Sequence, residues 1–256
     1  MKHYEVRDVV REQVGRDRLS DPMLDWCVAR GLRELEKCDN WYWMEAVKSF
    51  SLVIDQGDYS IYTSTSSGLN IPNYKDSRIL FVSDQTQTNP TWDEVWGPET
   101  IEEVKLAFAD TDEGMPVVWT QKETGGGSGI TVDSTMQVWP PNPDKTYSME
   151  LHYYQWTSLP TDITAETHEV LLRWPEALIY LATEQAMIVA TKDLNAGMFW
   201  RSLFRNPDPR KKTGEYDKIV RYNAQRQHAT RMEIHPRSSG NAQRGGVWRR
   251  NREVWV

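Results

Sequence analysis

The histidines are the first residues to test for chemistry, because imidazole binds metals and transfers protons near neutral pH. None has a second histidine or a cysteine at the spacing of a metal site, such as His-x-x-x-His on a helix. The G-x-S-x-G turn that presents a serine nucleophile is also absent. The sequence therefore predicts no catalytic residue, no metal ligand and no cofactor. The five histidines are His3, His152, His168, His228 and His235.

Adjacent carboxylates are the second candidates, because glycosidases hold two acidic side chains across a sugar. They occur at Asp93–Glu94, Glu102–Glu103 and Asp112–Glu113. Neighbouring carboxylates in polar segments are typical of a solvated surface, and no pattern in the sequence indicates that these pairs enclose a substrate. We interpret them as surface charges that favour solubility, and the protein is not predicted to be an enzyme.

Charge is unevenly distributed along the chain. The 256 residues have a net charge of -7, yet the segment after His235 contains five arginines and one glutamate. An acidic body argues against tight binding to nucleic acid phosphates. No apolar run approaches the ~20 residues that a membrane-spanning helix needs, so no membrane partner is expected.

The basic end of the chain, residues 233–256, has the residue types of an interface segment. Tryptophan and arginine are the residues most often found as interface anchors, whereas the segment has too little apolar mass to fold alone. We expect an extended tail that becomes ordered on a partner; a disordered tail without a partner is the alternative. The candidate anchors are Trp248, Arg249, Arg250, Arg252 and Trp255.

Helical patterns occupy the two ends of the chain. The stripe Leu24, Val28, Leu32 and Leu35 has helical spacing, and Asp21 before Pro22 is predicted to be its N-cap. Helical spacing returns after Thr164, where Pro175 is expected to begin or kink a second segment. We predict an α+β fold in which residues 1–46 and 164–232 form one helical core.

The middle of the chain, residues 47–163, has mainly strand patterns and is predicted to be an inserted antiparallel β subdomain, with one short helix within Pro98–Asp110. Its clearest strand follows a proline-rich segment, and we predict a hairpin whose loop is Pro140 to Lys145. The residues expected to face the β core alternate along this strand: Tyr147, Met149, Leu151 and Tyr153.

Tryptophans are frequent in the middle of the chain, and they support two interpretations. Tyr and Trp are enriched at protein interfaces, so core packing together with subunit contact is the first. A carbohydrate-binding module, which also places aromatic rings on a sheet, is the second. The tryptophans concerned are Trp92, Trp96, Trp119, Trp139 and Trp156.

A series of short motifs gives the chain a family resemblance over roughly Met1 to Met232. The motifs are Gly114-Met115-Pro116, then "WPPNPDKTYSMELHYY" with Pro140, Pro141, Asp144 and Tyr147, then Ser158-Leu159-Pro160, then "RWPEALIYLATEQA" with Trp174 and Pro175, and finally Lys192-Asp193. Their order resembles the head–tail adaptor (connector) proteins of tailed bacteriophages. The loop "NPDPRKKTG" and the last residues depart from the family's pattern.

The resemblance implies a non-enzymatic component of the virion that is assembled in the host cytoplasm. It implies a homo-oligomer, a dodecameric ring beneath the portal protein, that also contacts a downstream tail or nozzle protein. The genomic DNA would pass through the ring without specific binding. By analogy with the family, the tail with Trp248, Arg249, Arg250, Arg252 and Trp255 would bind the portal. An aromatic-rich carbohydrate-binding or other tail-associated structural module is the alternative.

Overall fold

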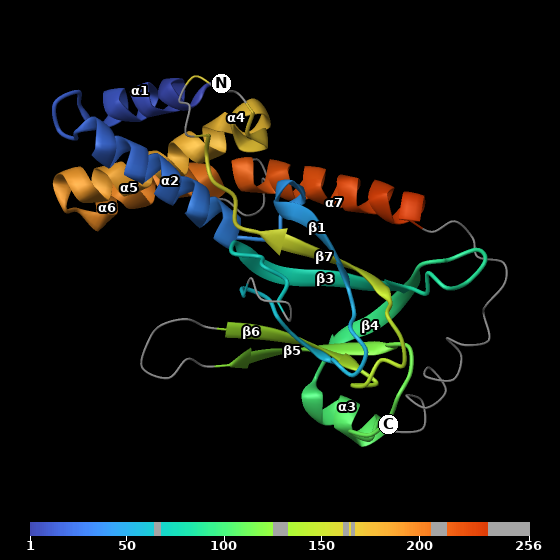
Figure 1. The fold of residues 1–256 in the computed structure, drawn as a ribbon. Coiled ribbons are helices and arrows are strands. Elements are labelled where there is room, and N and C mark those ends of the chain that lie inside the picture. Colours follow the sequence, from blue (N-terminus) through green and yellow to red (C-terminus); the bar gives the residue numbers. More distant parts are fainter. Residues whose placement is uncertain (64–67, 125–132, 161–163, 165–166, 206–213, 235–256) are drawn as a thin grey trace, which may run out of the picture.

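The computed structural model describes residues 1–63, 68–124, 133–160, 164, 167–205 and 214–234. Over these residues the fold is α+β, with seven α-helices and one curled, mixed sheet of seven strands. The helices gather at one end of the molecule and the strands at the other (Figure 1). The predicted α+β class is therefore confirmed.

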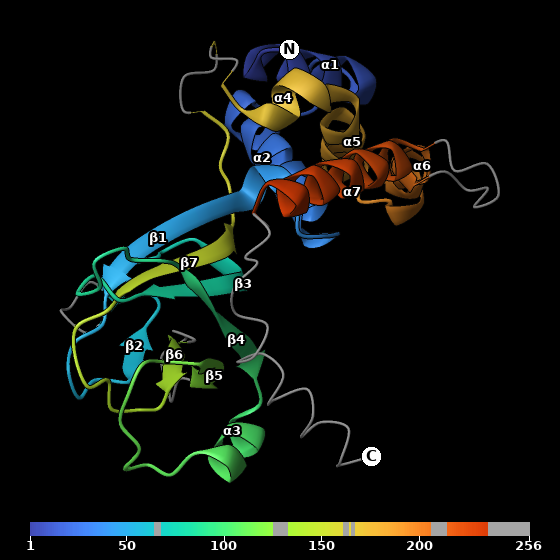
Figure 2. The same ribbon diagram turned by 90° about the vertical axis from the view of Figure 1, so that its right-hand side faces the viewer.

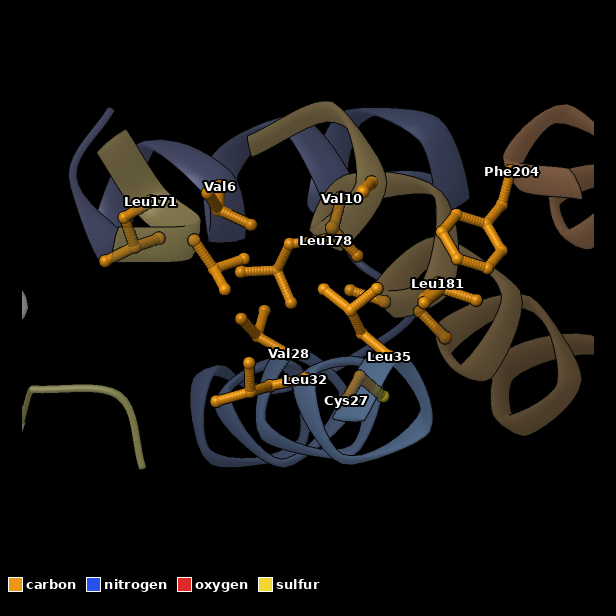
Figure 3. Close-up of a cluster of buried hydrophobic side chains, with 14 of the residues drawn as sticks. Val6, Val10, Cys27, Val28, Leu32, Leu35, Leu171, Leu178, Leu181 and Phe204 are labelled. Atoms are coloured by element: carbon orange, nitrogen blue, oxygen red, sulfur yellow. The ribbon is translucent and has the colours of Figure 1, made fainter. Parts of the chain in front are cut away.

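Helices from both ends of the chain share one buried cluster (Figure 3). Val6 and Val10 of α1 meet Leu178 and Leu181 of α5, and Leu32 of α2 packs into the same cluster. The helices are α1 (His3–Val14), α2 (Asp21–Lys37), α4 (Glu169–Arg173), α5 (Pro175–Thr191), α6 (Leu194–Arg205) and α7 (Glu215–Ile234).

Helix α2 begins one residue earlier than the sequence predicts. Ser20 has extended backbone angles and is the N-cap, so Asp21 is the first helical residue. The carboxylate of Asp21 is directed to α1 instead, where it forms ion pairs with Arg7 and Arg11. The predicted stripe is correct, since Leu24, Val28, Leu32 and Leu35 are all buried.

The strands surround a second buried cluster. In spatial order they are β1-β7-β3-β4-β5-β6-β2. The predicted inward face of β7 is confirmed, because Tyr147 just before β7 and Met149, Leu151 and Tyr153 within it all belong to this cluster. The bounds are β1 (Glu45–Ser51), β2 (Asp58–Ser60), β3 (Tyr74–Ser83), β4 (Asp93–Glu99), β5 (Val118–Thr124), β6 (Asp133–Trp139) and β7 (Ser148–Gln155).

The predicted hairpin around Pro140–Lys145 is wrong. Strand β7 pairs with β1 and β3, whereas β6 pairs with β5 and β2. The prolines cannot donate ladder hydrogen bonds, so residues 140–147 form a bend that carries the chain from one part of the sheet to another. Residues 52–57 bend beside it, with the amide of Leu52 donating to the carbonyl of Tyr147 at 2.9 Å and that of Val138 to Gly57 at 2.9 Å.

This pair of bends explains the curl of the sheet. β1 and β2 are the two edge strands in the spatial order, yet they are successive parts of the same bent segment. Their partners β6 and β7 are likewise successive strands, joined by the other bend. The two ends of the sheet are thereby brought round toward each other, which encloses the second cluster (Figure 2).

The sheet is mixed and not antiparallel as predicted. β4 and β5 run parallel, with Trp96 opposite Val118. The short helix α3 (Ile101–Ala107) lies between them in the chain. The segment with α3 carries the chain back to the end of the sheet where β4 begins, as a parallel pair of strands requires. Thr100 caps α3 by accepting a hydrogen bond from the amide of Glu103.

Candidate assembly surfaces

The motif residues Gly114, Pro116, Pro140 and Pro141 meet in the corner formed by the bends. The amide of Gly114 donates to the carbonyl of Asn142 at 3.1 Å, and Gly114 has a φ of 143°, in the region that favours glycine. Pro116 and Pro140 are buried, and Pro141 is partly buried. These residues hold the bends of the curled sheet together.

Asp144 and Tyr147 belong to a polar cluster on the rim of the same corner. The Tyr147 hydroxyl donates to Asp144 Oδ1 at 2.6 Å, and Lys145 Nζ donates to Asp84 Oδ2 at 2.5 Å. The Lys145 ammonium and the hydrogen bonds from Thr86 hold the pKa of Asp84 well below its usual range. Burial and the neighbouring Asp144 raise the pKa of Tyr147. Lys145 thus ties the bend to the end of β3.

Trp174 and Pro175 lie at the boundary between α4 and α5. Trp174 is the C-cap of α4 and the N-cap of α5, and Pro175 is the first residue of α5, as predicted. The Trp174 ring meets the Tyr222 ring of α7 edge-on, with centroids 5.6 Å apart. The motif therefore sets the angle between two helices of the shared cluster and supports α7.

A buried carboxylate lies where the helices join the sheet. Glu36, near the end of α2, is fully buried and accepts hydrogen bonds from the amide of Thr157 at 3.1 Å and from its hydroxyl. Burial raises the pKa of Glu36. Arg33 lies 3.7 Å from the other carboxylate oxygen. Thr157 follows β7, so this group fastens the strand end to α2.

His168 extends the Glu36 group to α4. Its Nδ1 accepts from the amide of Val170 at 3.2 Å, so the proton of the neutral ring is on Nε2. Nε2 donates to the Thr157 hydroxyl oxygen at 2.9 Å, which leaves the hydroxyl proton for Glu36. Burial lowers the pKa of His168. The chain of bonds from His168 through Thr157 to Glu36 joins three elements.

Trp156 is held between two cations beside this group. The Arg33 guanidinium lies 4.5 Å and the Lys75 ammonium 4.9 Å from the ring centroid. Lys75 also donates to the backbone carbonyls of Glu36 and Asp39. Trp156 therefore has a structural place at the junction between helices and sheet.

The other tryptophans of the middle region separate into buried and exposed pairs. Trp119 and Trp139 are buried, whereas Trp92 is 45% and Trp96 48% exposed. Trp96 pairs with Val118, and Val118 faces the side of the sheet that α3 covers. We define the β4–α3 face as Trp92, Trp96 and Leu106, all of which are exposed.

A second exposed apolar surface, on α6, was not predicted from the sequence. We define the α6 face as Leu194, Met198, Phe199 and Leu203, which are between 37% and 68% exposed. The signal was present, because "LNAGMFWRSLF" has more large apolar residues than one buried stripe can accommodate.

The five candidate anchors of the C-terminal tail, Trp248, Arg249, Arg250, Arg252 and Trp255, lie outside the described residues. Within the part of the chain that the structure describes, no three potential metal ligands come together. No helix in that part has the length and apolar character required to cross a membrane. The described surface thus offers apolar faces and polar junctions as its distinctive features.

Comparison with known proteins identifies the family. No curated protein matches the chain. The family model described as SU10 adaptor protein matches residues 1–231, which include both helical ends and the whole sheet. The order of motifs from Gly114 to Asp193 lies within this match. The chain therefore belongs to the SU10 adaptor protein family and is a bacteriophage head–tail adaptor.

Proposed function

We propose that this structural virion protein forms a ring, a dodecamer by analogy with related adaptors, beneath the portal protein. In this position it connects the capsid to the downstream tail or nozzle protein. The observation that carries the proposal is the family match over residues 1–231, together with exposed large apolar side chains, among them those of the α6 face and the β4–α3 face. Such faces mark sites of protein association.

A division into two units supports this role. We propose that residues 1–46 and 164–232 form the helical adaptor core and that residues 47–163 form a β-rich subdomain inserted into it. Two separate buried clusters support the division, one mainly helical and one within the sheet. Strand β7 contributes to both, since Tyr153 belongs to the sheet cluster and Tyr154 to the helical cluster. The Glu36 group would hold the two units at a fixed angle.

Genomic DNA passes through the ring without specific binding in this proposal. The chain has 37 acidic and 30 basic residues, of which one and five follow Ile234, so the remainder has 36 acidic against 25 basic. A channel lined by such a body repels phosphates, so the DNA slides through it. Duplex binding by the body alone would be weak and lost at physiological salt.

The C-terminal tail, residues 233–256, is the proposed portal-binding segment. Trp248 and Trp255 would fill apolar pockets between portal subunits, while Arg249, Arg250 and Arg252 would pair with portal carboxylates. Fixing the backbone costs roughly 1–2 kcal/mol per residue. The anchors must offset this cost, and repetition around a ring multiplies their effect.

Deletion of Gly245–Val256 tests this assignment. The truncated protein should keep the melting temperature of the full chain, because the helical and sheet clusters are formed by residues between Val6 and Ile219. It should fail to bind purified portal in a sedimentation assay. Undiminished binding by the truncated protein would show that another surface binds the portal.

A further inference from the structure

The α6 face is held outward by the packing of the same helix. A Cβ on Gly197 would lie 2.7 Å from the Ile188 side chain, so α6 approaches α5 closely at this point. Phe204 is buried on the same side. Arg201 Nε donates to Glu184 Oε1 at 2.7 Å, and its Nη2 lies 3.6 Å from Glu34 of α2. With these three residues fixed, α6 cannot rotate to bury its outer face.

The size of the α6 face is that of an interface core. Its four side chains together present on the order of 400 Å² of apolar surface. A stable interface buries roughly 800 Å² per partner, and its centre is more apolar than its rim. The α6 face can therefore supply the apolar centre of one side of an interface of that size.

Charge indicates which surface the α6 face meets. Residues 191–205 have three basic residues and one acidic residue, and Lys192 and Arg205 are exposed beside the apolar side chains. Arg201 is already paired with Glu184, so the exposed charges are Lys192, Asp193 and Arg205, with a net positive charge. Two copies of this face placed against each other would bring these net positive charges together. A self-complementary contact is therefore disfavoured, and the partner surface should be apolar and acidic.

The β4–α3 face of the same chain has that character. Trp92, Trp96 and Leu106 are exposed there by 45% to 90%. Residues 92–117 have eight acidic residues against one basic residue, Lys105. α3 and α6 lie at opposite ends of the molecule in both views (Figures 1 and 2). The two faces can therefore meet only between different copies.

We infer that the α6 face of one subunit binds the β4–α3 face of the next subunit. The contact joins two different surfaces, which is the arrangement that a closed ring or an open filament requires. The inferred contact is the one that would join neighbouring subunits of the proposed ring. Only the prediction that these contacts close into a ring rests on the proposed function. Salt bridges from Lys192 and Arg205 to the acidic face would form its rim.

Substitution of exposed residues tests the contact. We would measure self-association of the full chain by sedimentation velocity over a range of concentrations, for the wild type, Met198→Ser/Phe199→Ser and Trp96→Ser. Each variant should weaken association about 30-fold or more, the loss expected for an interface hot spot. The matched control is Leu172→Ser, which removes a 52% exposed leucine on α4, outside both faces, and should change nothing. All variants should remain folded with a cooperative melting transition well above the assay temperature, which excludes unfolding as the cause of weakened association.

Crosslinking shows which faces meet. Met198→Cys and Leu106→Cys would be made separately in a Cys38→Ser background, differently tagged, mixed and treated with a short bismaleimide. We expect crosslinks between the two different variants and none within either one alone. Crosslinks between two copies of Met198→Cys, or wild-type association by both serine variants, would overturn the inference.

The same samples separate this inference from the proposed ring. Mixed crosslinks accompanied by open filaments in electron micrographs would retain the contact and refute the ring. Rings that persist in Met198→Ser/Phe199→Ser would retain the ring and refute the contact. A wild-type chain that stays monomeric with and without portal would contradict both.

Discussion

Replacing Thr157 by valine should destabilise the protein by removing one hydroxyl and no volume. The hydroxyl donates to the fully buried carboxylate of Glu36 and lies 2.9 Å from Nε2 of His168. The amide of Thr157 still donates to the two carboxylate oxygens of Glu36, at 3.1 and 3.4 Å, so the carboxylate loses only the bond from the hydroxyl. Nε2 of His168 loses its acceptor as well. A hydrogen bond to a charged group contributes about 1.5–3 kcal/mol. We expect the free energy of unfolding to fall by that amount.

The assay is urea unfolding at pH 7, checked by thermal melting. A loss of this size lowers the Tm of a chain of 150–250 residues by roughly 3–12 °C. Thr157→Ser is the matched control, since it retains the hydroxyl and should cost much less. Ser158→Ala removes an exposed neighbouring hydroxyl and should be neutral.

The pH dependence provides a second test of the Thr157 prediction. Burial raises the pKa of Glu36, so the folded state binds a proton to it more tightly than the unfolded state does. As the pH falls toward and below the raised pKa, Glu36 becomes neutral and its need for the Thr157 hydroxyl decreases. The difference between the wild type and Thr157→Val should therefore shrink on acidification. A valine variant as stable as the wild type at pH 7 would refute the account of this junction.

Three further substitutions test other parts of the fold. Met149→Asp should destabilise by about 3–5 kcal/mol, because it places an unpaired charge in the sheet cluster; an unchanged melting temperature would contradict the assigned face. Asp84→Asn should make the free energy of unfolding less dependent on pH in acid. The pKa of Asp84 is lowered beside Lys145, so ionised Asp84 stabilises the wild type at pH values above its usual pKa of 3.8, and this stabilisation is lost as the pH falls below 3.8. Equal slopes of stability against pH in the two proteins would exclude this. Gly31→Ala should cost about 1–3 kcal/mol, because the added Cβ would lie 2.7 Å from the backbone nitrogen of Ala182 and push α2 from α5; equal urea midpoints would show that the helices can separate without cost.

The helices and the inward face of β7 were predictable because their signals are local. The spacing of Leu24, Val28, Leu32 and Leu35 identifies the buried stripe of α2 from the sequence alone, and Pro175 correctly predicts the start of α5. Alternation along β7 likewise identified the residues that enter the sheet cluster. Each of these patterns depends on neighbours within a few turns or a single strand.

Strand pairing was not predictable in the same way. The sequence between Val138 and Tyr147 is compatible with a hairpin loop, and only the distant segment 52–57 shows that it is one of two bends that run side by side. β4 was missed because it contains Asp93, Glu94, Gly97 and Pro98, which disfavour strands. Its place between β3 and β5 is decided by pairing with segments elsewhere in the chain.

The candidate surfaces also differ in how far the sequence alone could identify them. The tail anchors from Trp248 to Trp255 were chosen by residue type and remain a prediction. The motif residues from Gly114 to Tyr147 were chosen by resemblance, and the structure gathers them at one corner of the sheet. The excess of large apolar residues in α6 is visible in the sequence, whereas the packing of Gly197 and Phe204 against the other helices decides which of them are buried.

The most direct test of the central claim is electron microscopy of the full-length chain, alone and mixed with the portal protein of its phage. The account predicts closed rings with twelve copies of the chain, stacked coaxially on the portal with an open central channel. Monomers that leave the portal undecorated at saturating concentration would contradict the claim that this protein is a ring-forming adaptor beneath the portal.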